Sequence, residues 1–281
     1  MSGTLYVVAT PIGNLEDITL RALRVLREVA LIAAEDTRRT ARLLAHYSIT
    51  TRTVSFHTHN TRARLPQLIS RLQAGENIAL VTDAGTPCVS DPGLELVQAC
   101  IAGGIPVDPI PGASAPLAAL VASGFPMDPV TLLGFPPNRG KDRKMWLERV
   151  ASLESTVVCF EAPHRIGHLL KELRQYMGFR PIMIGRELTK LHQDFQRGTA
   201  EALLAELKEP KGEFTVVLGP YAVRPMAVEA PSAQRLAHEF GQLTDNGEIG
   251  KRAAILELAN RYSYRPRQVY ALLEEAKDSG D

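Results

Sequence analysis

Apolar residues in the first 124 positions fall into short runs, and each run ends at a polar or glycine-rich loop. Most runs are followed by apolar residues at helical spacing, as with Ala22, Val25, Leu26 and Val29 after the first run. Short runs bounded by turn residues indicate buried strands, whereas the spacing of three to four residues indicates amphipathic helices. We expect strands here at residues 5–9, 31–34, 54–56, 78–81 and 105–110.

Strands that alternate with helices are typical of a mostly parallel sheet with helices on both faces. The pattern breaks near Gly124 and then resumes, with expected strands at 130–135, 156–160, 182–186 and 214–218. Helices are expected near 165–177 and 199–207. The predicted fold class is therefore α/β, with an N-terminal α/β domain at 1–124 and a C-terminal α/β domain at 125–222.

The last part of the chain has a different character. Residues 222–232 contain two prolines and no clear periodicity, which favours a linker. Three short helical patterns follow between residues 232 and 277. We interpret this region as a small helical appendage.

The composition suits a two-domain protein with no strong overall field. The chain has 281 residues, 45% of them hydrophobic, and a net charge of +1. Contact with a polyanion must therefore come from local basic patches. One patch contains Arg139, Lys141, Arg143 and Lys144, and a second contains Lys251, Arg252, Arg265 and Arg267. Such patches can hold phosphates, although the helical tail has an alternative role in capping or dimerisation.

Cysteine and histidine usage predicts neither disulfides nor a metal site. The three cysteines are scattered, which favours free thiols. Two histidine pairs, at 57 and 59 and at 164 and 168, lack carboxylate or cysteine partners at ligand spacing. No signal-peptide pattern occurs, and no apolar run approaches the ~20 residues of a membrane span. We expect a soluble, cytoplasmic protein.

Three loops rich in glycine, proline and small hydroxyl residues each follow an expected strand of the first domain, at residues 10–14, 83–90 and 111–114. The carboxyl ends of parallel strands share one edge of a sheet, and open α/β sheets bind ligands there. The alternative is that these loops are ordinary turns. The first loop has one glycine where a dinucleotide-binding loop needs three, so a Rossmann site is not expected.

Charged residues also stand beside the expected strand ends of the second domain, at residues 160–165, 185–190 and 211–215. Such runs are often no more than solvated ion-pair surfaces. Because these charged runs recur at strand ends, a functional role and a solvated ion-pair surface are equal alternatives.

Six motifs, taken together and in this order, resemble one known family. They are ATPIGNLEDITLRAL, AAEDTRRT, LVTDAGTPCVSDPG, PIPGAS, GRELTK and KGEFTVVL. The resemblance is to the ribosomal RNA small subunit methyltransferase I family, within the tetrapyrrole methylase superfamily, and it extends over essentially the whole chain.

The resemblance implies two α/β domains with S-adenosylmethionine bound in a cleft between them, and a homodimer. It implies 2′-O-methylation of a cytidine ribose in the decoding region of 16S rRNA, with the free rRNA or the 30S subunit as partner. The tail resembles the helix-turn-helix-like segment of many family members. Alternatives are a tetrapyrrole C-methyltransferase of the same fold and an RNA-binding protein without catalysis.

The same resemblance implies a set of cofactor-binding residues from both domains. These are Pro11, Asp83, Ala84, Gly85, Thr86, Ser114, Ala115, Phe160, Glu213 and Thr215. A neutral ribose hydroxyl is a poor nucleophile, so a general base or a charge-stabilising group is also expected. We assign this role to Glu187, which Arg186 and Lys190 flank, and we include Lys190 among the catalytic residues. Glu161 is the competing base and Asp36 a third possibility.

Overall fold

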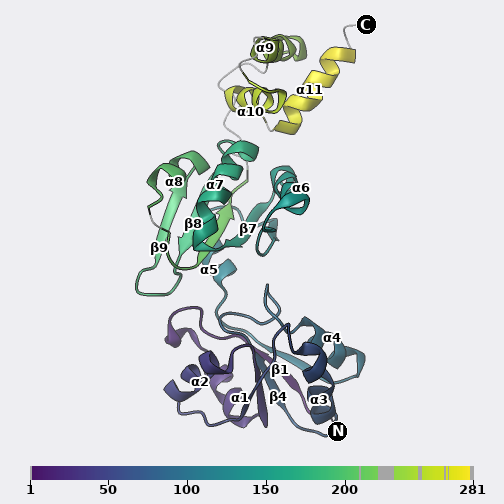
Figure 1. Cartoon of the computed structure of the whole chain (residues 1–281), viewed down its shortest axis with the longest axis vertical. Helices are drawn as coiled ribbons and strands as arrows, with labels where there is room; N and C mark the ends of the chain where they lie inside the picture. Colours follow the sequence, from purple (N-terminus) through teal and green to yellow (C-terminus); the bar gives the residue numbers. More distant parts are fainter. Residues whose placement is uncertain are drawn as a thin grey trace. The chain divides into compact units, whose positions relative to one another are not determined.

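The computed structural model describes residues 2–208, 210–220, 231–245, 249–262, 264 and 266–278. The chain forms two compact units (Figure 1). The N-terminal unit comprises Met1–Ala118 and Glu187–Gln193, and the C-terminal unit comprises Ala119–Arg186 and Asp194–Asp281. Most of the predicted linker at 222–232, and Arg265 of the second basic patch, lie outside the described residues.

The N-terminal unit is built on a five-stranded parallel sheet with the order β3-β2-β4-β1-β5. Each strand overlaps one of the strands expected from the sequence, and the carboxyl ends of all five lie at one edge. The strands are β1 (Leu5–Val8), β2 (Leu31–Ala34), β3 (Thr53–Ser55), β4 (Ile78–Val81) and β5 (Val107–Ile110).

Helices cover both faces of this sheet, because successive side chains on a buried strand point to opposite faces. On one face, Leu26 and Leu44 pack in a core with Val81. On the other, Leu72 and Leu96 pack with strand residues of the opposite parity. The first pair of helices is α1 (Leu20–Glu28) and α2 (Thr37–His46), the second is α3 (Thr61–Gln73) and α4 (Leu94–Ala102), and the short helix η1 is Leu15–Asp17. Helix α5 (Ala115–Ser123) follows β5.

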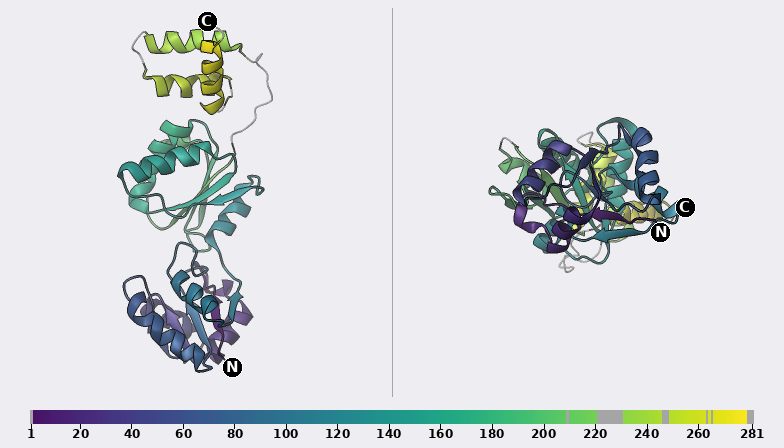
Figure 2. Two further views of the ribbon diagram at one scale, coloured as in Figure 1. Left: turned by 90° about the vertical axis from the view of Figure 1, so that its right-hand side faces the viewer. Right: turned by 90° about the horizontal axis from the view of Figure 1, so that it is seen from below.

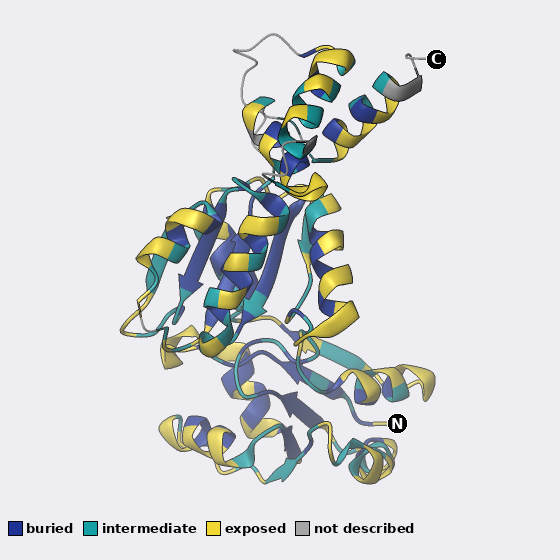
Figure 3. Ribbon diagram, turned by 45° about the horizontal axis from the view of Figure 1, so that its top comes forward, coloured by how far each residue is buried: buried dark blue, intermediate teal, exposed yellow. Residues whose placement is uncertain are grey.

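The C-terminal unit has a mixed sheet with the order β6-β7-β10-β8-β9, in which only β6 and β7 pair in parallel. Its strands are β6 (Val130–Leu132), β7 (Thr156–Glu161), β8 (Ile182–Arg186), β9 (Asp194–Gly198) and β10 (Phe214–Leu218). Helices α6 (Gly140–Ser152), α7 (Pro163–Met177) and α8 (Ala200–Glu206) pack on it around one core. The buried strands stand out in dark blue in Figure 3.

A buried arginine, Arg180, connects three segments of this unit. The Arg180 guanidinium donates to the carbonyl oxygens of Gly219 at 2.6 Å, Val150 at 2.8 Å and Ser155 at 2.8 Å. A buried charge is tolerated when hydrogen bonds replace its hydration. Arg180 therefore joins the end of α6, the start of β7 and the end of β10.

The tail forms the predicted helical segment, with its own small core around Leu236, Leu258 and Val269. Its helices are α9 (Ala233–Asp245), α10 (Lys251–Tyr262) and α11 (Pro266–Asp278), drawn in olive to yellow in Figure 2. The guanidinium carbon of Arg252 lies 3.7 Å from the ring centre of Tyr176 on α7. Among the described helices, none combines the length and apolar character that a membrane span requires.

Candidate active site

Three loops meet at the carboxyl edge of the N-terminal sheet. Thr10 and Gly85 form reciprocal backbone hydrogen bonds of 2.9 and 3.0 Å, which join the loop after β1 to the loop after β4. The Thr86 hydroxyl donates to the carbonyl oxygen of Ala113 at 3.4 Å, which joins the second loop to the loop after β5. The structure thus brings together the three loops that the sequence indicates as one ligand site.

Backbone conformation explains why these loops are rich in small residues. Gly85 has a φ of +82°, in the left-handed region that glycine adopts without a steric penalty. Cys88 at +69° and Ser90 at +65° hold similar angles despite their side chains. Such strained residues concentrate at ligand sites, where the surrounding structure holds them in place.

Asp83 is the central carboxylate of this edge. Its Oδ1 accepts from the backbone amide of Asp36 at 3.1 Å, and its Oδ2 lies 3.3 Å from Nη1 of Arg39. Its own backbone amide donates to Glu35 Oε2 at 3.3 Å. These contacts fix the carboxylate in one orientation, while 24% of its side chain stays exposed.

Neighbouring carboxyl groups titrate differently because their surroundings differ. Burial raises the pKa of Asp91 to about 6, and the nearby charges of Glu35 and Asp83 add to this effect. Burial also raises the pKa of Glu35. By contrast, hydrogen bonds from Arg38 hold the pKa of Asp36 well below its usual range. Asp36 is therefore a weak base, which disfavours it as the third catalytic possibility.

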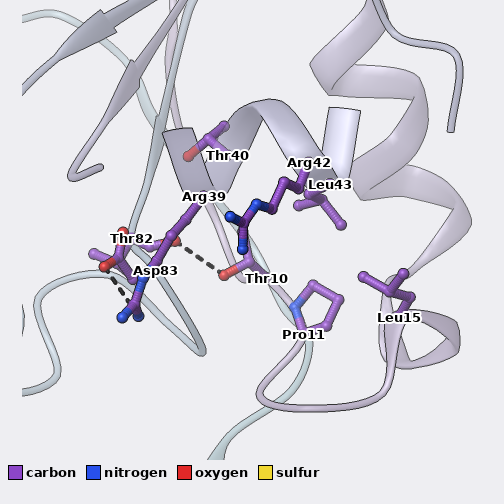
Figure 4. Close-up of a pocket in the computed structure, with 9 residues that line it drawn as sticks. All are labelled: Thr10, Pro11, Leu15, Arg39, Thr40, Arg42, Leu43, Thr82 and Asp83. Atoms are coloured by element: carbon purple, nitrogen blue, oxygen red, sulfur yellow. Dashed lines mark hydrogen bonds and ion pairs between the residues drawn. The ribbon is translucent and has the colours of Figure 1, made fainter. Parts of the chain in front are cut away.

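A cavity of about 160 Å³ opens beside Asp83 (Figure 4). Thr10 and Pro11 of the first loop form one wall, and residues of α2 form another. The α2 residues are Arg39, Thr40, Arg42 and Leu43. The only sequence signal for this wall is the group of arginines that follows the acidic pair at 35 and 36.

The segment Glu187–Gln193, which follows β8, belongs to the N-terminal unit and packs on its first loop. The backbone amide of Asn14 donates to the Thr189 hydroxyl at 3.0 Å. Gly13 leaves room for this contact, because a Cβ there would lie 2.5 Å from Cγ of Lys190 and 2.7 Å from the carbonyl oxygen of Leu188. We call these residues the 187–193 segment.

The predicted catalytic pair lies in this segment. Lys190 Nζ donates to Glu187 Oε1 at 2.9 Å, and both side chains are partly exposed. Glu187 has a φ of +50° and Thr189 of +64°, so the segment holds two non-glycine residues in the left-handed region. The 187–193 segment therefore places a carboxylate and an ammonium group beside the loop that contains Pro11.

Glu161 does not have the exposure that a general base needs. It is 2% exposed, and its Oε1 lies 3.1 Å from Arg165 Nε and accepts from the Ala162 amide at 2.9 Å. Arg143 Nη2 lies 3.9 Å from its Oε2 and 2.6 Å from Glu172. The structure thus corrects the assignment of Glu161 as the competing base, since it belongs to a buried ion network.

The same network corrects the expectation that Arg143 is part of an RNA-binding patch. It is 4% exposed, it is held by Glu172, and it also donates to the carbonyl oxygen of Pro137 at 2.8 Å. It therefore cannot contribute to a surface that meets RNA. The other predicted cations of this segment, Arg139, Lys141 and Lys144, are exposed.

In the tail, Lys251, Arg252 and Arg267 are exposed.

Phe160 and Thr215, expected to bind the cofactor, are direct partners on the antiparallel strands β7 and β10. The Phe160 ring lies 5.3 Å from that of Phe135, Thr215 is buried, and Glu213 is exposed just before β10. Of the three cofactor-binding residues expected in the C-terminal unit, the structure thus brings Phe160 and Thr215 together.

Comparison with known proteins first gives the class. Residues 4–204 match the family model of the Tetrapyrrole (Corrin/Porphyrin) Methylases. Among solved structures, diphthine synthase has a TM-score of 0.61 at 16% identity, over 77% of this chain and 90% of that one. A Thermus thermophilus uroporphyrin-III C-methyltransferase complexed with S-adenosyl homocysteine has a TM-score of 0.55 at 19% identity, over 76% and 97%. These two similarities show the fold.

Relatives of higher sequence identity then identify the family within this class. A Synechocystis protein is 44% identical over 99% of this chain and its own full length, and a Mesorhizobium japonicum protein is 43% identical over 98% and 92%. A Thermotoga maritima protein is 46% identical over 77% and 98%. All three are named ribosomal RNA small subunit methyltransferase I. The chain belongs to this family of tetrapyrrole methylases, which confirms the predicted fold class and family.

Proposed function

We propose that this chain methylates the 2′ hydroxyl of a cytidine ribose in the decoding region of 16S rRNA. Its family membership makes it an S-adenosylmethionine-dependent methyltransferase, and its relatives are named for the small-subunit rRNA. The observation that best supports the proposal is the packing of the 187–193 segment on Gly13 and Asn14. This packing brings the charged pair Glu187–Lys190 to the unit that contains the three joined loops.

The residues of these loops fit the cofactor. Gly85 occupies a left-handed conformation, and Gly112 lets the loop after β5 pack closely on the end of β1, because a Cβ there would lie 2.9 Å from that of Ala9. The partly exposed carboxylate of Asp83 suits the hydroxyl or ammonium groups of S-adenosylmethionine. The site is proposed to include further residues of these loops, Pro11, Ala84, Thr86 and Ser114, and Ala115 at the start of α5. The proposed residues of the C-terminal unit are Phe160, Thr215 and Glu213.

When bound, S-adenosylmethionine supplies an electrophilic methyl group. The task of the rigid loops is to hold the reacting atoms in line, which lowers a barrier by up to roughly 7–11 kcal/mol. We assign to Glu187 the role of general base, which accepts the proton of the ribose hydroxyl. Its carboxylate is partly exposed and is paired with Lys190. Lys190 orients that carboxylate.

Exposed cations supply the proposed RNA contacts. Arg139, Lys141 and Lys144 on and before α6, and Lys251, Arg252 and Arg267 in the tail, carry charge on the surface where phosphates can reach it. Arg265 completes the proposed tail patch by sequence alone. The substrate places the reaction in the cytoplasm, and the family resemblance favours a homodimer.

Two measurements test the activity. Titration calorimetry with S-adenosylmethionine should show binding, and labelled methyl groups should enter 30S subunits or naked 16S rRNA. Nucleoside mass spectrometry should then identify 2′-O-methylcytidine. Absence of cofactor binding would overturn the methyltransferase, label on a base would overturn the ribose assignment, and label only in a tetrapyrrole acceptor would favour the alternative reaction.

The catalytic assignment has its own test. Glu187→Gln should lower kcat by about 10²-fold or more, the usual contribution of a general base, with little change in cofactor affinity. Glu28 on α1 forms a surface ion pair with the exposed Arg24 at 2.9 Å, so Glu28→Gln should leave kcat unchanged. An unchanged kcat in Glu187→Gln would exclude it as the base.

A further inference from the structure

Arg42 is a cation that the proposed chemistry has not used. Its side chain is exposed and lines the cavity beside Thr10 and Pro11. Within the described part of the chain it has neither an ion pair nor a hydrogen bond. Arg39, the other arginine of the cavity wall, is turned toward Asp83 and paired with it at 3.3 Å (Figure 4).

The remaining polar groups of the cavity favour an anionic oxygen as ligand. The hydroxyl of Thr40 can donate or accept, and the guanidinium groups can only donate. Asp83 is the one carboxylate among the described lining residues, and Arg39 and the Asp36 amide already compensate it. The uncompensated positive charge of the cavity therefore belongs to Arg42.

Two anionic groups have the right chemistry, a phosphate of an RNA backbone and the carboxylate of S-adenosylmethionine. An arginine fork binds either one through two parallel hydrogen bonds. The exposure of Arg42 favours the larger ligand, because a polynucleotide reaches an open surface without being enclosed. Thr10, Pro11 and Asp83 also belong to the proposed cofactor loops, so a phosphate bound here would lie close to the target ribose.

We propose that Arg42 anchors a backbone phosphate of the RNA substrate at the α2 wall of this cavity, with Thr40 and Arg39 as flanking donors. This inference rests on the proposed function, since it names a positioning contact for the same reaction. A phosphate contact fixes the register of a strand, whereas it carries no base preference.

The test compares Arg42→Met with the full-length wild type. Methionine keeps an aliphatic side chain against the cavity and removes the charge. Filter binding to 16S rRNA between about 50 and 200 mM salt should show roughly tenfold weaker binding. The slope of log K against log salt should become less negative by about 0.7 to 0.9, the value for one phosphate. The calorimetric Kd for S-adenosylmethionine should not change.

Two further variants serve as controls. Arg42→Lys keeps the charge but loses the fork, so it should retain the salt slope and recover only part of the affinity. Arg24→Met on α1 removes an exposed arginine that does not line the cavity, and it should bind RNA like the wild type. Thermal unfolding of each variant shows whether it is folded.

The outcomes separate the two proposals. If wild type binds RNA and methylates it while Arg42→Met has unchanged RNA affinity and salt slope, the phosphate contact is overturned and the proposed function stands. If Arg42→Met instead weakens S-adenosylmethionine binding, the cavity holds the cofactor carboxylate and the phosphate assignment is wrong. If wild type neither binds rRNA nor methylates it, the proposed function itself fails.

Discussion

Arg39 and Asp83 form an ion pair, 3.3 Å between Nη1 and Oδ2, that ties helix α2 to the loop after β4. Asp83 is thereby oriented from two sides, because the Asp36 amide holds its other oxygen at 3.1 Å. A carboxylate fixed in this way needs no reorganisation when a ligand arrives, which favours binding.

Asp83→Asn should weaken binding of S-adenosylmethionine by about tenfold or more, because a charge-assisted hydrogen bond becomes a neutral one. Titration calorimetry measures the change. Asp108→Asn is the matched control, since Asp108 lies on β5 in a surface pair with Arg21 at 2.6 Å. An unaltered Kd in Asp83→Asn would mean that this carboxylate does not meet the cofactor.

Gly13→Ala should displace the 187–193 segment, because the new Cβ would lie 2.5 Å from Lys190 Cγ and 2.7 Å from a backbone oxygen. Misplacing Glu187 by about an ångström should lower kcat/KM roughly 10- to 100-fold, with ~1 kcal/mol less free energy of unfolding. Methyl transfer and denaturant unfolding measure the two effects. Gly250→Ala meets nothing within 4 Å and should change neither; full activity of Gly13→Ala would argue against the role of the segment.

Arg143→Met should destabilise the protein without a specific loss of RNA affinity. It removes the cation that lies 2.6 Å from Glu172, whose side chain is 16% exposed, and the more distant of the two cations near the fully buried Glu161 side chain, at 3.9 Å. Breaking a buried ion pair costs about 3–5 kcal/mol. Urea unfolding should show this loss, while Lys144→Met next to it should stay within ~0.5 kcal/mol. A stable Arg143→Met protein with a reduced salt slope would restore Arg143 to the RNA surface.

Asp91 predicts a pH dependence of stability. Its pKa is raised to about 6, from 3.8, chiefly by burial, so the folded state keeps a proton that the unfolded state releases. The free energy of unfolding should therefore fall as pH rises between about 4 and 6, and the loss should be complete above pH 6.

Asp91→Asn removes this titration and should be more stable than wild type at pH 7 by ~1 kcal/mol, less than the full shift because the carboxyl is partly exposed. The exposed Asp142→Asn should bring no such gain. Thermal unfolding at pH 4, 5, 6 and 7 follows both variants; identical curves for wild type and Asp91→Asn would contradict the prediction.

The central strands β2 and β4 of the N-terminal sheet could be predicted well because they are buried on both faces. Buried strands are short apolar runs, and β2 and β4 begin and end where their runs do. Strand β9 has no such signal: Asp194–Gly198 reads DFQRG, and an edge strand needs no apolar run. Backbone pairing with β8 creates it, and local sequence does not reveal that pairing.

The candidate site could be predicted in part for a similar reason. Loop composition indicated the strand ends at which the candidate site lies, and the topology of the sheet brings those loops together. Arg143 shows the limit, because an arginine in a basic stretch looks exposed until its partner Glu172, on another helix, is known. The Arg39–Asp83 pair and the contact of Asn14 with Thr189 are likewise set by tertiary structure.

The membership of Glu187–Gln193 in the N-terminal unit affects the order in which a newly made chain can assemble. Residues 119–186 are synthesised between the two parts, which takes roughly 3–14 s at 5–20 residues per second. During that interval all the strands of the parallel sheet have been synthesised, whereas the 187–193 segment that packs on Gly13 and Asn14 has not. A nascent chain stopped before Glu187 would have the three joined loops without the charged pair, so the proposed catalytic assignment requires about two thirds of the chain to leave the ribosome before methyl transfer begins.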